Sequence, residues 1–349
     1  MPFPLTHLRR LLSLALLGLA TAPALAADEV VLKIAHFLPS ISTAQKQVLE
    51  PWCDELTRQS AGRLKCQFYA SLQLGGTAAQ LAEQVKTGVA DIAWTAPGFS
   101  TGRFPKTEVL ELPGIIPLGG LSGGRAIWRY YEEQLKSEYH DYKVLAMHGD
   151  GGMNVHTAGK PLARFEDFNG LKLRAPNRTI SRTLAALGAM PVAMPPAQVT
   201  EALSKGVVDG ASTVWEVMVP TKMDEVTRVH FETPADKPAL GGTVLSLLMN
   251  KQKYDSLPAD LKAIIDRNSG LPLVETFGKV YDVAANKARD KVKAMPGHTV
   301  TVVPAADYDR ALKRLEVVQQ EWVDANKDRF PAEQLLKAAR QLSAAPARK

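Results

Sequence analysis

Arg174 is the residue best placed for chemistry in this sequence, because it ends a predicted strand just before a predicted helix. Asn177 is predicted to cap that helix, so free backbone amides and the positive end of the helix dipole lie near the guanidinium. A planar guanidinium donates two parallel hydrogen bonds to a carboxylate. The pattern therefore predicts a carboxylate-binding site. A surface or interdomain ion pair is the alternative for a single arginine after a strand.

Further candidates lie at or beside the ends of other predicted strands, where open α/β sheets bind their ligands. They are His36, Phe37, Trp94, Trp215 and Glu216. Trp94 and Trp215 could stack on the two sides of a flat ligand, although core packing is the commoner role of a tryptophan. Glu216 is predicted to bind a ligand hydroxyl, with a solvated carboxylate as the alternative.

Residues 120–124, with the sequence GLSGG, match the nucleophile elbow of secreted hydrolases. That elbow needs a strand before its serine and a helix after it. Residues 113–119 do not resemble a strand, and Ser122 is predicted instead to be the N-cap of a helix. A serine hydrolase is therefore the second candidate class.

The two cysteines lie on neighbouring predicted elements, Cys53 on a helix over residues 43–60 and Cys66 on a strand over residues 64–69. Seven helical residues back from Ser60 span about 10 Å, and Cys66 lies a similar distance along the returning strand. We predict a structural disulfide, with two buried free thiols as the alternative. The spacing matches no pattern of metal ligands, and no metal or other cofactor is expected.

Short strands alternate with helices along the whole chain, which is typical of α/β domains with largely parallel sheets. Besides the elements above, we predict strands at 30–37, 89–94, 171–174 and 207–212, and helices at 78–87, 123–137, 178–187, 197–205, 258–268 and 272–294.

Two segments of similar sequence, residues 83–91 and 201–209, share a glutamate, an apolar position, a glycine, a valine and an aspartate. In both, a helix ends at the glycine and a strand follows. They are 118 residues apart, too far for a solenoid repeat. We therefore predict two similar α/β lobes with a cleft between them. The first lobe is predicted to contain residues 27–150 and about 240–279, and the second residues 151–239 and about 280–349.

The first 26 residues have the pattern of a secretory signal peptide: Arg9 and Arg10, an apolar run over residues 11–20, and Ala24-Leu25-Ala26 before the cleavage point. The apolar run is shorter than the ~20 residues that span a bilayer. Removing this segment lowers the formal net charge from +6 to +4. Acidic and basic residues alternate along the remainder, which argues against a nucleic-acid partner.

Eight short stretches, taken in their order and spacing, resemble the extracytoplasmic solute-binding proteins of TRAP transporters, the DctP-type family. They are SAGRL at 60–64, QLGG at 73–76, GVADI at 88–92, GRFP at 102–105, DFNGLKLR at 167–174, LGAMPV at 187–192, GVVDG at 206–210 and MNK at 249–251.

This resemblance implies a two-lobed periplasmic-binding-protein-like fold with a long helix that spans both lobes, for which residues 272–294 are the candidate. It also implies a monomer in the periplasm of a Gram-negative bacterium that is not an enzyme. Such a protein captures a small organic acid between its lobes and delivers it to a sodium-driven membrane permease. A periplasmic receptor that serves a sensor system would use the same binding chemistry.

The family places its carboxylate-binding arginine at the position of Arg174. Some relatives carry a second arginine about twenty residues earlier, where this sequence has Asn154. Specificities that use two cations therefore do not transfer. The amide of Asn154 is predicted to bind a hydroxyl or a second carboxylate oxygen. His156 is predicted to add a donor, with an ordinary strand residue as the alternative. Some keto-acid-binding relatives use a glutamate to help hold a metal ion, which is a further alternative for Glu216. Which organic acid binds, and whether a metal ion assists its binding, is left open.

Overall fold

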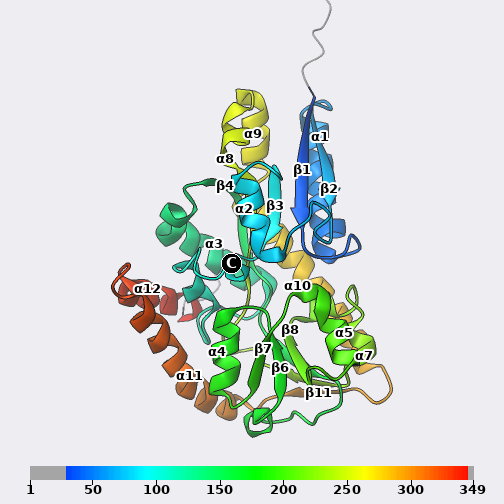
Figure 1. Ribbon diagram of the computed structural model, residues 1–349, viewed down its shortest axis with the longest axis vertical. Helices are drawn as coiled ribbons and strands as arrows, with labels where there is room; N and C mark the ends of the chain where they lie inside the picture. Colours follow the sequence, from blue (N-terminus) through cyan, green and yellow to red (C-terminus); the bar gives the residue numbers. More distant parts are fainter. Residues whose placement is uncertain (1–28, 345–349) are drawn as a thin grey trace, which may run out of the picture.

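The computed structural model describes residues 29–344, which form two β-sheets surrounded by helices (Figure 1). The predicted signal peptide lies outside these residues. The first sheet has the strand order β2-β1-β3-β10-β4. Its strands are β1 (Val30–His36), β2 (Leu64–Tyr69), β3 (Ile92–Thr95), β4 (Tyr142–Gly149) and β10 (Val244–Asn250). The strand β1 runs parallel to β2 and β3, whereas β10 is antiparallel to β3 and β4.

The second sheet has the order β11-β9-β5-β8-β6-β7. Its strands are β5 (Asn154–Thr157), β6 (Lys172–Ala175), β7 (Met190–Ala193), β8 (Gly210–Thr213), β9 (Val229–Glu232) and β11 (Thr299–Val302). The strand β10 returns to the first sheet after β9, and β11 then returns to the second. The two sheets are therefore built from interleaved segments of the chain.

The helices cover the faces of these sheets, and most lie within a few residues of their predicted positions. The α-helices are α1 (Glu50–Gln59), α2 (Leu81–Lys86), α3 (Gly120–Tyr130), α4 (Arg178–Ala186), α5 (Val199–Ser204), α6 (Trp215–Met218), α7 (Met223–Val226), α8 (Lys251–Ser256), α9 (Ala259–Arg267), α10 (Leu271–Lys293), α11 (Ala305–Asn326) and α12 (Ala332–Ala344). The π-helical and 3-10 segments are η1 (Ala44–Leu49), η2 (Ala78–Gln80), η3 (Pro97–Phe99), η4 (Thr107–Glu111), η5 (Tyr131–Leu135), η6 (Lys136–Tyr139), η7 (Phe165–Phe168) and η8 (Pro196–Gln198).

The two similar segments of the sequence play the same part in the two sheets. The carboxylate of Asp91, just before β3, accepts the backbone N–H of Lys33 on β1 at 2.8 Å. The carboxylate of Asp209, just before β8, accepts the backbone N–H of Lys172 on β6 at 2.9 Å. Each aspartate thus fixes the start of one strand against its parallel neighbour.

The helix α10 is the predicted long helix, and it lies beside both sheets (Figure 1). Its first half packs against α3 and β4, and its second half places Ala288 and Val292 in the apolar core of the second sheet. The crossing with α3 is very close. A Cβ atom added at Gly278 would lie 2.5 Å from the Cα of Leu121. Only glycine allows the two helices to approach this far.

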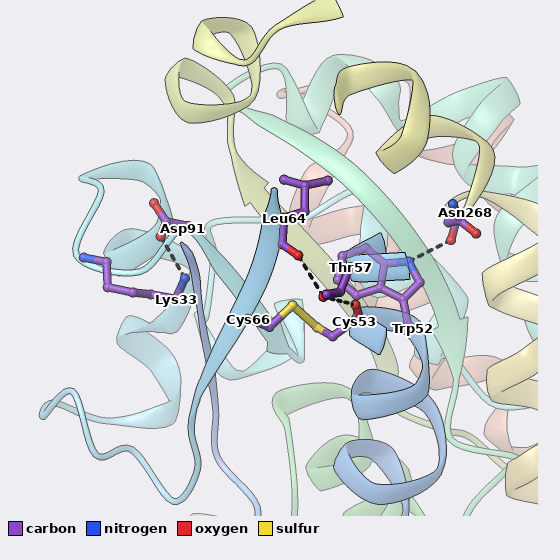
Figure 2. Close-up of a disulfide and its surroundings, with 8 residues drawn as sticks. All are labelled: Lys33, Trp52, Cys53, Thr57, Leu64, Cys66, Asp91 and Asn268. Carbon is purple, nitrogen blue, oxygen red and sulfur yellow. Dashed lines mark hydrogen bonds between the residues drawn. A yellow bond between two sulfur atoms is a disulfide. The ribbon is translucent and has the colours of Figure 1, made fainter. Parts of the chain in front are cut away.

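The predicted disulfide is present. The bond joins Cys53 on α1 to Cys66 on β2 with a Cα–Cα distance of 6.0 Å (Figure 2). The hydroxyl of Thr57 lies beside it and donates to the backbone oxygens of Cys53 and Leu64. On the other side of α1, the indole N–H of Trp52 donates to the backbone oxygen of Asn268 at 2.8 Å.

The chain crosses between the sheets at residues 150–153, after β4, and at residues 233–243, after β9. Asp150 ties these crossings together, because its carboxylate accepts the backbone N–H groups of Gly152 and Thr243 at 3.0 and 2.9 Å. Helix α11 packs on α4, and α12 packs on η4, so the C-terminal helices contact both halves. The predicted lobe boundaries stay a prediction. Within residues 29–344, no helix is long and apolar enough to cross a membrane.

Candidate functional site

A cavity lies between the two halves, at the edge where several strands end. It encloses about 560 Å³ of empty space, part of it open to solvent. The first half contributes mainly aromatic and aliphatic side chains, and the second half contributes the charged residues Arg174 and Glu216. Its lining residues are Phe37, Leu38, Trp94, Phe99, Asp150, Arg174, Pro176, Pro196, Val199, Thr213, Val214, Glu216, Val217, Thr221, Met223, Thr243 and Leu245.

Arg174, on β6, is a buried cation, with 4% of its surface exposed. Its Nε donates to the backbone oxygen of Met194 and its Nη1 to that of Ser212, both at 3.1 Å. Across residues 29–344 no carboxylate oxygen lies within 4.0 Å of the guanidinium, and its Nη2 has no protein partner. Burial without a counter-ion lowers the pKa of Arg174 to about 10. An unpaired buried charge is unfavourable, so this site favours an anion.

The helix after Arg174 begins as predicted. The side chain of Asn177 accepts the backbone N–H of Ile180 at 2.8 Å and so caps α4. A smaller cavity of about 250 Å³ adjoins the first and shares Arg174 with it. Two carbonyl groups thus hold the guanidinium, and Arg174 lines both cavities.

An aromatic wall faces the cavity from the first half. The rings of Phe37 and Trp94 are stacked, with centroids 4.9 Å apart and planes at 10°. Phe99 meets Phe37 edge-on at 5.1 Å. The indole N–H of Trp94 already donates to His148 at 3.1 Å, so this side chain offers the cavity apolar surface. Such a wall suits a flat apolar group.

Two carboxyl groups also line the cavity, that of the buried Glu216 and that of the half-buried Asp150. Burial raises the pKa of Glu216 to about 8, and Asp150 adds to this effect while a hydrogen bond with Thr43 opposes it. Burial likewise raises the pKa of Asp150 to about 6, against its hydrogen bonds with backbone N–H groups. Glu216 is therefore mostly a neutral carboxylic acid at pH 7, because the low-dielectric interior disfavours its charged form.

The family model named "Bacterial extracellular solute-binding protein, family 7" (DctP) matches residues 34–325. The chain belongs to this family. The resemblance to TRAP solute-binding proteins is thereby confirmed.

Solved structures of such proteins share the fold. A TRAP solute-binding protein from Rhodoferax ferrireducens T118, in complex with copurified benzoate, is 38% identical, with a TM-score of 0.86 over 90% of this chain and 98% of that one. A marine metagenome TRAP solute-binding protein specific for aromatic acid ligands, with 3-hydroxybenzoate, is 35% identical, with a TM-score of 0.87 over 91% and 99% of the two chains. Among curated proteins, the C4-dicarboxylate-binding periplasmic protein DctP of Rhodobacter capsulatus is 29% identical over 47% of this chain and 48% of its own length.

These matches confirm the two-lobed α/β fold, and the protein is a TRAP solute-binding protein. The family is one of solute-binding proteins outside the cytoplasm.

The GLSGG segment has a structural role in this fold. Ser122 lies inside α3, where its hydroxyl donates to the backbone oxygen of Leu118 at 2.6 Å. Its predicted position as N-cap is wrong, because α3 begins earlier, at Gly120.

Of the predicted ligand residues, Arg174, Phe37, Trp94 and Glu216 line the cavity of this solute-binding protein, and Trp215 does not. Trp215 lines a second cavity, and its indole N–H donates to Glu232 at 2.7 Å. The two tryptophans therefore do not lie on opposite sides of one cavity. At the start of α6, Glu216 lines the first cavity and the adjacent Trp215 lines the second.

The remaining three candidates, His36, Asn154 and His156, also lie outside the cavity that Arg174 lines. His36 is fully buried and bonds Gln45 at 2.7 Å. His156 is also fully buried and bonds His230 at 2.8 Å. Asn154 lines the second cavity and donates to the backbone oxygen of Gly152 at 3.4 Å.

Sequence reasoning missed Asp150, Phe99 and Thr243 as lining residues of this cavity. Asp150 carried a usable signal, because it stands among three glycines at the predicted boundary between the lobes. Phe99 and Thr243 lie in irregular segments and carried none.

Proposed function

We propose that this protein binds a small aromatic monocarboxylate in the cavity between its lobes and delivers it to a TRAP membrane permease. The observation that carries the proposal is the buried guanidinium of Arg174, which has no counter-ion in the described part of the chain. A ligand carboxylate would accept hydrogen bonds from its Nη2 and neutralise it.

The rest of the cavity supports an aromatic ring and a single negative charge. Phe37, Trp94 and Phe99 present flat apolar surface on one side, and aliphatic side chains such as Val217 and Leu245 complete the enclosure. Arg174 is the one basic residue among the lining side chains. A dicarboxylate would need a second cation. Similar proteins at 38% and 35% identity are described with benzoate and 3-hydroxybenzoate.

The mechanism is capture without chemistry on the ligand. The lobes are joined by the crossings at 150–153 and 233–243, and the cavity is lined by side chains from both, so that a bound ligand would contact both. A ligand that makes more contacts in the closed state shifts the population toward that state. We propose that the protein is a periplasmic monomer, exported by its signal peptide, and that the closed form is what a sodium-driven permease recognises.

Isothermal titration calorimetry on the ligand-stripped mature chain tests this proposal. Benzoate is the probe, benzamide is its uncharged counterpart of similar shape, and succinate is a dicarboxylate without a ring. We expect benzoate to bind and the other two to bind at least roughly 100-fold more weakly, because each lacks a feature that the cavity requires. Equal affinity for benzoate and benzamide, or binding of succinate alone, would contradict the proposal.

A further inference from the structure

Glu216 forms a polar contact between the two halves of the protein. It is the second residue of α6, directly after β8 of the second sheet, and 4% of its surface is exposed. Its carboxyl group lies near the side chain of Thr43, which lowers the pKa of Glu216 and stands before η1 on the first half. Because Glu216 also lines the cavity, it can contact a bound ligand as well as the other half of the protein.

The surroundings of Glu216 contain acidic groups and lack a neighbouring cation. The charge of Asp150, from the crossing after β4, raises the pKa of Glu216. The charges of Glu216 and Asp150 in turn raise the pKa of Tyr281 on α10. Asp150 is satisfied by two backbone N–H groups, whereas the buried Tyr281 hydroxyl has no partner. On α7, which packs on α6, Asp224 is bound to Lys291. Within the described residues, no Lys, Arg or His nitrogen lies within 4.0 Å of the Glu216 carboxyl.

These contacts give the cavity two chemically different parts. Arg174 offers positive charge, and it forms no ion pair with Asp150 or Glu216 in the described chain, so a ligand carboxylate need not displace a protein carboxylate. The part around Glu216 offers an uncharged carboxyl group that can both donate and accept a hydrogen bond. A second anionic group of a ligand would meet Asp150 there without a cation to compensate it.

We propose that Glu216 is a specificity-determining residue that acts as a neutral carboxylic acid, selecting aromatic monocarboxylates that carry a hydroxyl group away from the carboxylate and rejecting dicarboxylates. The inference rests on the proposed function and goes further, because it assigns the second recognition group of the ligand. Its pH dependence follows from burial, which raises the pKa of Glu216 to about 8. Above that pH the acid loses the proton that it donates.

The test compares three ligands by calorimetry at pH 7 and pH 9: benzoate, 3-hydroxybenzoate and benzene-1,3-dicarboxylate. The variants are Glu216→Gln, which keeps a neutral group with a donor and an acceptor, and Glu216→Leu, which removes both. Glu225→Gln is the matched control, because Glu225 is exposed on α7 and does not line the cavity. Binding of benzoate by each variant shows that it is folded.

We expect the wild type at pH 7 to bind 3-hydroxybenzoate about 10-fold more tightly than benzoate, the range of one net hydrogen bond, and to bind the dicarboxylate more weakly than both. The wild-type dissociation constant for 3-hydroxybenzoate should rise about 10-fold at pH 9, because roughly nine-tenths of Glu216 is then ionised. In Glu216→Gln it should stay constant with pH, and in Glu216→Leu the preference for the hydroxyl should disappear.

Several outcomes would overturn the inference while leaving the proposed function intact. They are a pH-independent wild type, a Glu216→Leu variant that still prefers 3-hydroxybenzoate, or a Glu225→Gln control that loses the pH dependence. Failure of the wild type to bind any of the three acids at pH 7 would instead contradict the proposed function itself.

Discussion

Arg174 carries the charge on which ligand binding is proposed to depend, and its two hydrogen bonds to backbone oxygens hold it in place before any ligand arrives. Replacing it by methionine keeps an unbranched apolar stem but removes the charge and the donors. We expect Arg174→Met to lower the affinity for benzoate by about 2–5 kcal/mol, as is typical when one partner of a desolvated charge pair is removed. Calorimetry measures the change, with Arg164→Met at an exposed arginine as the control. Affinity within threefold of the wild type would contradict the assignment.

The raised pKa of Glu216 also predicts how the free energy of unfolding of the unliganded protein depends on pH. Burial raises its pKa from the ordinary value of 4.5 to about 8, so the folded state holds a proton that the unfolded chain releases. Its contribution to the free energy of unfolding therefore falls between about pH 5 and pH 8, by at most about 1.4 kcal/mol per pH unit, and is constant above pH 8.

Urea unfolding of the wild type and Glu216→Gln at pH 5, 6.5, 8 and 9 checks this sign. The variant should gain stability relative to the wild type as the pH rises to 8 and then keep its advantage. Asp150 and the buried histidines titrate in both proteins and cancel in the difference. For Glu225→Gln the difference should stay flat, and a flat difference for Glu216→Gln would mean that this carboxyl is ionised in the folded protein.

The chemistry of the candidate residues could be predicted from the sequence, but the direction of their side chains could not. At the end of β1, His36 turns into the core and the next residue, Phe37, lines the cavity. At the start of α6, Trp215 and Glu216 divide in the same way between the two cavities. Neighbouring side chains point to opposite faces of a strand and in different directions around a helix, so a prediction of where a strand ends leaves two neighbouring residues equally placed. Arg174 escaped this ambiguity because the helix cap at Asn177 fixed its surroundings.

At the scale of single elements, the disulfide between α1 and β2 is expected to stabilise the fold without affecting the ligand. Cys53 and Cys66 are joined by a disulfide and are 13 residues apart in the sequence (Figure 2). Neither cysteine lines the cavity that Arg174 lines. In the double variant Cys53→Ser, Cys66→Ser, we expect the free energy of unfolding to fall by about 3 kcal/mol, the loop-entropy value for a loop of this size.

Urea unfolding measures the stability of this double variant, and calorimetry with benzoate measures its binding. The dissociation constant should stay within twofold of the wild-type value while the unfolding midpoint falls. A large loss of affinity with an unchanged midpoint would show that the bond shapes the cavity and does not mainly stabilise the first sheet.

The contact between α3 and α10 shows why a short motif can mislead. The glycines of the GLSGG segment match a hydrolase elbow, yet in the fold they allow helices to touch. A Cβ atom at Gly120 would lie 2.7 Å from the backbone oxygen of Gly278. Glycine is selected at such a position by close backbone approach. The sequence contains the glycines of both helices but does not state that they meet, because residues 120 and 278 are distant along the chain.

At the scale of the whole molecule, the division into two similar halves was predictable from the sequence. The repeated segments around Asp91 and Asp209 indicated two similar halves, and both aspartates hold equivalent strands. The positions of α11 and α12 were less accessible. They depend on contacts between distant segments, such as the Tyr130 hydroxyl donating to the backbone oxygen of Leu335 at 2.9 Å. Local patterns of apolar residues predict that a helix exists and do not determine where it packs.

The same architecture predicts a change of shape on binding. The cavity has walls from both halves, and the Thr43–Glu216 contact joins them. Asp150 holds the two crossings together at one end, so that the halves can rotate about this end. We therefore expect saturating benzoate to reduce the radius of gyration measured by small-angle X-ray scattering. Identical profiles with and without benzoate at saturation would contradict closure by the ligand.

The Arg174→Met variant separates charge from shape in this experiment. It keeps the aromatic wall of Phe37, Trp94 and Phe99 and loses the cation. A ligand shifts a conformational equilibrium only by the difference in its affinity for the two states. If the carboxylate contact on the second half is what differs between them, the variant will keep its unliganded scattering profile at benzoate concentrations that saturate the wild type. If the variant closes as well once benzoate is raised to saturate it, the aromatic contacts drive closure, and Arg174 contributes affinity alone.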